Sequence, residues 1–128
     1  MTMKPYFSFA CFMLLSLGRF GQVYVKGVNI NELPEVKRIH LMTEEYFPLA
    51  GDNFLDLWLD YGQEDRFTPK MFKQNSNITD SLGVQKNFRT TGQLINFMEN
   101  QGWQHYLTVA AGTEKNNEFR HFFRRKEP

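Results

Sequence analysis

Alternation of hydrophobic and polar residues predicts strands in the first half of the chain. It is clearest over residues 54–61, as expected of a strand with one buried face. The two faces of that strand consist of Leu55, Leu57, Leu59 and Tyr61 on one side and Phe54, Asp56, Trp58 and Asp60 on the other. Residues 23–30 and 36–42 are rich in β-branched and apolar residues, so we interpret each as a strand. Asn31-Glu-Leu-Pro34 forms the break between them.

Turn-forming residues dominate the segments that follow. Pro48 and Gly51-Asp52 mark a loop. Residues 62–77 are polar, which favours either a long loop or a weak edge hairpin. Residues 78–88 contain the turn sequence Asp80-Ser-Leu-Gly83, and we expect a short hairpin there.

One helix is predicted, over about residues 91–101. Thr90 and Gln93 have the spacing of a capping box, in which the hydroxyl accepts from the backbone N–H three residues on while the amide reaches back. Gly102 falls where a left-handed residue commonly ends a helix, and Trp103 can then fold back on the last turn. The apolar stripe of this helix consists of Leu94, Ile95, Phe97 and Met98.

The end of the chain predicts a hairpin. Residues 104–111 and 118–125 read as two strands joined by the turn 112–117. Several strands, one helix and a closing hairpin together predict an α+β fold. We expect an antiparallel β-sheet with the helix of about 91–101 packed on one face, as a two-layer sandwich. The pattern leaves open which face of the sheet the helix covers.

Residues 1–18 have the pattern of a signal peptide. Lys4 is their only charge, an apolar run follows, and small residues stand at Ser16 and Gly18. We therefore predict cleavage after Gly18 and a single exported domain over 19–128. The run is shorter than the roughly 20 residues that a membrane span needs. An N-terminal element packed into the fold is the alternative, and a lipid anchor at Cys11 is left open.

Composition narrows the classes of partner. The net charge of the 128-residue chain is +1, and removing residues 1–18 removes Lys4 and no acid, so the mature charge is 0. A neutral domain has no general attraction to nucleic acid or anionic lipid, which argues against nucleic acid as the partner. The only cysteine, Cys11, lies in the leader, so the mature domain has no disulfide. An exported domain without cysteines fits a bacterial envelope.

No pattern for catalysis, metal or cofactor binding stands out. The final hairpin is expected to hold His105 and His121 several strand positions apart, too far to share an ion bonded at about 2.1 Å, and His40 has no close partner. Asp56 and Asp60 are expected roughly 13 Å apart along one strand, beyond the roughly 5–9.5 Å of glycosidase pairs. No nucleophile turn and no phosphate-binding glycine loop is present.

Two surfaces are candidates for binding. In the first, aromatic rings alternate with carboxylates and could stack on a sugar or receive a cationic partner, unless a loop or the helix buries them. It consists of Phe54, Asp56, Trp58 and Asp60. In the second, basic residues alternate with aromatic ones, as in proteins that bind single-stranded nucleic acid. It consists of Arg120, Phe122, Arg124 and Arg125. The alternative for the second is a half-buried terminal strand whose arginines protect a sheet edge.

The string Leu94-Ile-Asn-Phe-Met-Glu-Asn-Gln-Gly-Trp103 is followed by a hairpin that ends in the basic tail Phe123-Arg-Arg-Lys126. Together with Asn31-Glu-Leu-Pro34 and Leu59-Asp-Tyr-Gly-Gln63, these residues make the chain resemble small exported Bacteroidetes proteins of unknown function. In those proteins a helix ending in Gly-Trp leads into a closing β-hairpin. The resemblance covers most of residues 23–126. It implies a bacterial, exported and non-enzymatic protein and contributes no catalytic residue.

These observations predict an exported, non-catalytic module of the bacterial envelope, periplasmic, envelope-associated or secreted, that binds a protein or glycan partner. The alternative is a cytoplasmic accessory protein that binds nucleic acid through the basic C-terminal strand. A small hydrolase is the third hypothesis, and it would need a pocket that gathers polar residues from distant loops.

Overall fold

The computed structural model describes residues 21–45, 54–64, 76–112 and 117–127. The predicted leader 1–18 and the loop at Pro48 and Gly51-Asp52 lie outside the described residues, as does most of 62–77. The elements in chain order are β1 (Tyr24–Val25), β2 (Val28–Asn29), the 3₁₀ helix η1 (Ile30–Glu32), β3 (Arg38–Glu45), β4 (Asp56–Asp60), β5 (Ile78–Thr79), α3 (Thr91–Asn100), β6 (Trp103–Ala110) and β7 (Asn117–Arg125).

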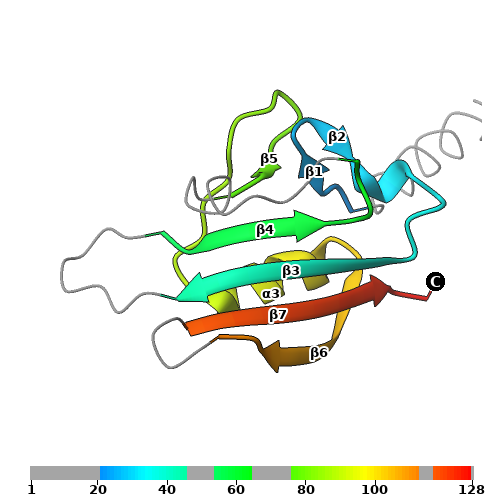
Figure 1. Cartoon of the computed structure of the whole chain (residues 1–128). Coiled ribbons are helices and arrows are strands. Elements are labelled where there is room, and N and C mark those ends of the chain that lie inside the picture. The colour runs from blue at the N-terminus through cyan, green and yellow to red at the C-terminus, as the bar shows by residue number, and fades with distance from the viewer. Residues whose placement is uncertain (1–20, 46–53, 65–75, 113–116, 128) are drawn as a thin grey trace, which may run out of the picture.

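Two antiparallel sheets and one main helix make up this fold. The larger sheet has the strand order β4-β3-β7-β6, and the smaller has the order β2-β1-β5. In Figure 1, α3 lies behind the larger sheet, and the small sheet lies beyond the β4 edge. The predicted α+β class, with a helix packed against an antiparallel sheet, is confirmed.

The core lies between the larger sheet, α3 and the small sheet. Leu55, Leu57 and Leu59 are buried there, and Tyr61 packs against them. Leu94 and Met98 of α3 belong to the same cluster, so the helix covers the leucine face of β4. The other face of the larger sheet points away from α3, and we call it the outer face.

The first predicted strand is wrong in detail. Residues 23–30 form a hairpin of two short strands, β1 and β2, in place of one continuous strand. Lys26 and Gly27 both have positive φ, 50° and 82°. Two consecutive left-handed residues make the tight turn whose twist suits a two-residue hairpin. The sequence did not predict this turn, because β-branched residues alternate on both sides of it. Of its two residues, only Gly27 is of a type that favours a positive φ.

The helix ends are built much as predicted. The Thr90 hydroxyl accepts from the Gln93 N–H at 3.1 Å. The Gln93 amide oxygen reaches back to the N–H of Arg89 at 3.0 Å, one residue before the cap, so the capping box is displaced by one position. Gly102 has φ of 90°, and Trp103 beyond it is fully buried.

Asn31 ties the end of α3 to the small sheet. Its side-chain oxygen accepts from the N–H of Val23 and from the indole N–H of Trp103, both at 3.1 Å. Its amide nitrogen donates to the Gln101 carbonyl at 2.8 Å. The predicted break at 31–34 is therefore also a structural junction.

Arg125 completes this junction from β7. Its guanidinium lies 4.7 Å from the centre of the Trp103 ring. It donates hydrogen bonds of 2.7 to 3.2 Å to four backbone carbonyls, those of Ile30, Asn31, Leu33 and Val36. These bonds take up four of the five N–H groups of the guanidinium, whose fork has a fixed geometry. Arg125 is therefore held in the framework of the fold, at the junction with Asn31 and Trp103.

Candidate binding surfaces

The outer face of the larger sheet is a grid set by strand register. Each row of this grid crosses the strands from β4 toward β6. The rows are Arg38–Arg124–Gln104, Asp60–His40–Phe122–Leu107, Trp58–Met42–Arg120–Val109 and Asp56–Glu44–Glu118. The face is therefore basic at one end, acidic at the other, and aromatic or apolar over much of its centre.

Aromatic contacts organise the middle of the outer face. The His40 and Phe122 rings stack with centroids 5.0 Å apart and an interplanar angle of 7°. Tyr106 approaches Phe122 at 6.4 Å, and the Arg124 guanidinium lies 5.6 Å from the centre of the Tyr106 ring. Arg124 also donates to the side-chain oxygen of Gln104 at 3.3 Å. Of the predicted basic strand, Phe122 and Arg124 thus share this cluster, while Arg120 is exposed in the next row.

His40 is held in an unusual state within this cluster. Its Nε2 atom is buried and has no hydrogen-bond partner in the described part of the chain. Burial lowers the pKa of His40, with Asp60 acting against this shift and Arg120 adding to it. The lowered pKa favours the uncharged form of His40, which suits its stack on Phe122.

The four residues of the predicted aromatic–carboxylate site are not brought together as one exposed surface. Trp58 and Asp56 are only 4% and 7% exposed. Phe54 is part-exposed, and the guanidinium of Arg89 lies 5.6 Å from its ring centre. Asp60 accepts from the N–H of Gly62 at 2.8 Å and so shapes a turn. One strand face does not guarantee one environment, since neighbouring segments cover it unevenly.

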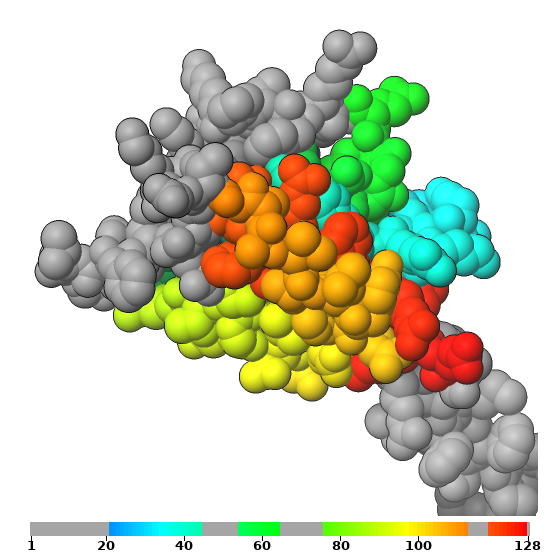
Figure 2. Space-filling view, turned by 60° about the horizontal axis from the view of Figure 1, so that its bottom comes forward, coloured from blue at the N-terminus to red at the C-terminus, as the bar shows by residue number. Residues whose placement is uncertain are grey.

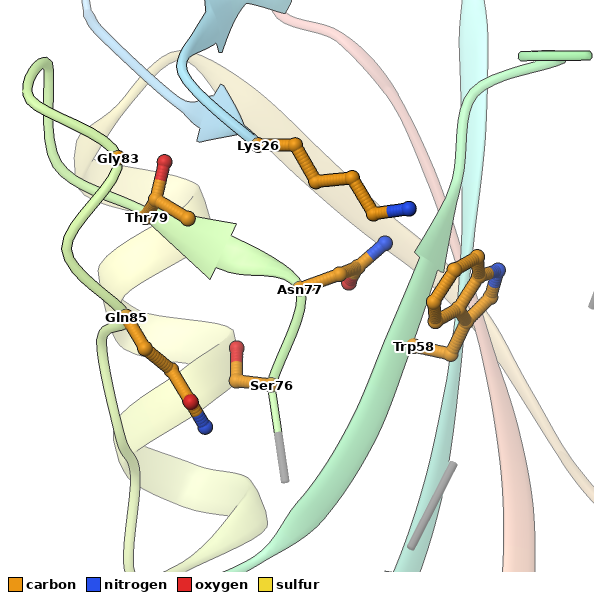
Figure 3. Close-up of a pocket in the computed structure, with 7 residues that line it drawn as sticks. All are labelled: Lys26, Trp58, Ser76, Asn77, Thr79, Gly83 and Gln85. Carbon is orange, nitrogen blue, oxygen red and sulfur yellow. The ribbon is translucent and has the colours of Figure 1, made fainter. Parts of the chain in front are cut away.

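Trp58 does border a pocket of about 290 Å³ at the β4 edge (Figure 3). The Lys26 ammonium, from the β1–β2 turn, lies 5.3 Å from the centre of its ring. The lining comes from three segments far apart in the sequence. It consists of Lys26, Trp58, Ser76, Asn77, Thr79, Gly83 and Gln85.

The polar groups that line this pocket hold the fold together. Asn77 accepts from the N–H of Leu59 at 2.7 Å and donates to its carbonyl at 2.9 Å, as a neighbouring strand would. Thr79 accepts from the N–H of Gly27 at 2.9 Å, and Ser76 accepts from the N–H of Ile78 at 2.9 Å. A polar ligand would have to compete with these contacts, so the pocket is better explained as a junction of segments than as a sugar site.

His105 and His121 lie much closer than the sequence predicted. Their ring centroids are 6.0 Å apart. The Thr108 hydroxyl lies between them, 2.7 Å from Nε2 of His105 and 2.8 Å from Nδ1 of His121. The hydroxyl of Thr43 is 2.9 Å from Nε2 of His121. This network joins three strands and borders a second pocket, of about 260 Å³, lined by Thr91, Ile95, Thr108, Phe119 and His121.

A β-bulge explains the error. The register of β6 against β7 shifts between His105 and Leu107, so that His105 and Thr108 both point to the helix side of the sheet. The spacing of the histidines in the sequence carries no signal for such a bulge. In the described ranges, no group of three or more His, Cys, Asp or Glu side chains could hold a metal ion.

Among the described strands, β6 forms an edge of the larger sheet with no strand paired beyond it. The sequence identified it only as a strand. Its eight residues, Trp-Gln-His-Tyr-Leu-Thr-Val-Ala, include no Lys, Arg, Asp, Glu or Pro. Tyr106, Leu107 and Val109 are 41%, 47% and 43% exposed. Figure 2 shows this strand, in gold and orange, across the front of the molecule. An uncharged strand with large apolar side chains is unusual at an open edge, where proteins normally place charges or Pro.

Comparison of the chain with protein-family models, with curated proteins and with solved structures found no match. In the parts that the structure describes, α3 and the short η1 lack the length and apolar character that a membrane crossing requires.

Proposed function

We propose that this chain is an exported, non-catalytic accessory domain of the bacterial envelope that binds a protein partner. The partner contacts β6 and the adjoining outer face. The single observation that carries this proposal is the uncharged, exposed edge strand with three large apolar side chains. An edge of this kind is a template for a strand of another chain, because its backbone groups supply affinity and its side chains supply selectivity.

A protein partner fits the described residues better than a glycan does. Sugar binding needs hydroxyl, amide or carboxylate groups that are available beside an aromatic ring. Around Trp58, the side chains of Ser76, Asn77 and Thr79 already bond to backbone. Tyr106, Leu107 and Val109 instead present apolar surface, which is what a protein interface buries at its centre.

Nucleic acid is the second candidate, and one observation favours it. Arg124, Tyr106 and Phe122 lie together on the outer face, and such a mixture can stack on bases. Against it, Arg125 is occupied inside the fold and the mature net charge is 0. Gel-shift titration of a labelled single-stranded oligonucleotide at low salt, with Arg120→Ala/Arg124→Ala as the control, decides between the two.

The proposal is tested by photo-crosslinking in cells that produce the full chain. A benzophenone amino acid is placed at Leu107. The matched control carries it at Leu82, which is 87% exposed in the turn that follows β5 of the small sheet. We expect protein conjugates from position 107 and none from position 82. Absence of conjugates at both positions would overturn a protein partner at this edge. Equal conjugates at both would show contact without a specific site.

A further inference from the structure

We propose that the partner at this edge is a second copy of the chain, whose β6 pairs antiparallel with the first β6 about a two-fold axis. The two larger sheets then form one continuous sheet of eight strands. This inference rests on the proposed protein-binding function and specifies its partner.

The backbone of β6 has groups that point to the open edge. Ala111 donates its N–H to the Glu118 carbonyl at 2.9 Å, so its peptide groups point toward β7. Successive residues of a strand point their peptide groups to opposite edges. The N–H and C=O groups of Thr108 and Ala110 therefore point away from β7, and the described residues supply no strand to pair with them.

The open part of the edge has a defined length. The carboxylate of Glu99 accepts from the N–H of His105 at 3.2 Å, which occupies the start of β6. The β-bulge between His105 and Leu107 follows, and bulges protect an edge by twisting it away. The described residues protect no more of the edge than this, so Leu107 to Ala111 is the stretch that pairing can use.

Two-fold pairing of this stretch is chemically self-consistent. Outward-pointing residues must face one another. Within Leu107 to Ala111, two registers pair Thr108 in this way, opposite either Ala110 or Thr108 of the second copy. In these two registers Val109 lies on the outer face opposite Val109 or Leu107 of the second copy. Apolar side chains therefore meet apolar side chains in both registers, and no charge on β6 opposes the pairing. Cross-strand apolar pairs of this kind stabilise antiparallel sheets.

The charges of the outer face favour a second copy over an unrelated strand. Arg38 and Arg124 lie at the end of the face where β6 begins, and Glu44 and Glu118 at the end where it finishes. Antiparallel pairing reverses the second copy, so the basic end of one copy faces the acidic end of the other across the two β6 strands, with the two β7 strands about 14 Å apart. The same patch is thus complementary to itself, as an isologous interface requires.

Sedimentation velocity on the purified wild-type chain, over about 1 to about 200 μM, tests this pairing because the range spans the affinities of small interfaces. We expect a concentration-dependent monomer–dimer equilibrium. Val109→Lys puts two ammonium groups near the two-fold axis and is expected to weaken dimerisation at least about tenfold. Leu82→Lys adds the same charge elsewhere and should leave the equilibrium unchanged. Far-UV circular dichroism checks that both variants fold.

Hydrogen exchange of the wild-type chain measures directly whether the β6 amides form hydrogen bonds across the interface, and it needs no variant. The amide protons of Thr108 and Ala110 should become more protected as concentration rises, while that of Leu82 should not. A chain that stays monomeric throughout overturns the second copy. If the crosslinker at position 107 then still gives conjugates in cells whose mass differs from that of two copies of the chain, the protein-binding function stands and only the second copy is rejected. A dimer that leaves Thr108 and Ala110 unprotected, or that tolerates Val109→Lys, also overturns the pairing, since its interface lies elsewhere.

Discussion

Trp103 is the residue whose removal should damage the fold most. Its side chain is fully buried and is the largest of the fully buried side chains in the described residues. It fixes three parts of the chain at once, since it follows the helix end, donates to Asn31 at 3.1 Å and lies under Arg125. Trp103→Ala therefore removes core packing, a hydrogen bond and a cation–π contact together.

The magnitude follows from these three contributions. Replacing a buried Trp by Ala costs about 3–5 kcal/mol through lost burial and the cavity that remains. The indole hydrogen bond contributes about 1 kcal/mol, and the guanidinium contact about 0.5–2 kcal/mol. These terms overlap, so we expect a loss of about 4–6 kcal/mol. A domain of this size is stable by about 5–15 kcal/mol in total, so the variant should be at the margin of folding.

Urea denaturation followed by far-UV circular dichroism measures the effect. Trp103→Phe keeps most of the apolar volume but loses the N–H donor, and should cost about 1–3 kcal/mol. Tyr106→Ala removes an exposed aromatic ring on the same strand and should cost under about 1 kcal/mol. A loss below about 1 kcal/mol for Trp103→Ala would refute the reasoning, because no buried Trp at a junction is that dispensable.

Three other predictions concern stability. Gly102→Ala should lower the free energy of unfolding by about 1–2 kcal/mol, because φ at this position is 90°. The added methyl group has space, since its nearest neighbour is 4.0 Å away. An unchanged midpoint in urea denaturation would contradict this prediction. Asn77→Ala leaves the N–H and C=O of Leu59 without the Asn77 amide and should cost about 2–4 kcal/mol in the same assay, whereas a cost under about 0.5 kcal/mol would mean water replaces the amide. The lowered pKa of His40 means that the unfolded chain, with its ordinary value of 6.5, takes up the proton first. The free energy of unfolding should therefore be constant above about pH 6.5 and fall as the pH drops below it. Urea midpoints measured against pH should show this fall, and His40→Phe should make it smaller.

The sequence was informative where one local interaction decides the structure. Gly102-Trp103 predicted both the helix end and a core anchor, because a left-handed residue and a large apolar ring have few other uses at that position. The alternation over 54–61 grouped Leu55, Leu57 and Leu59 on one face of the strand, and the structure places these three side chains in the core with α3. Such signals need only the residue and its near neighbours in the chain.

The sequence was misleading where contacts between distant segments determine the structure. The four carbonyls that bind Arg125 come from residues 30–36, so nothing local separated it from the exposed Arg124. The bulge that brings His105 beside His121 depends on pairing with β7. The position of β6 at the sheet edge likewise follows from strand order, which the pattern of single strands does not contain.

Fractionation of cells that carry the photo-crosslinker at Leu107, followed by intact-mass measurement of the conjugates, tests export and partner binding in one experiment. The account predicts conjugates in the envelope or secreted fraction, formed by a chain that has lost residues 1–18. Full-length chain recovered in the cytoplasm, with no conjugate from position 107, would contradict it.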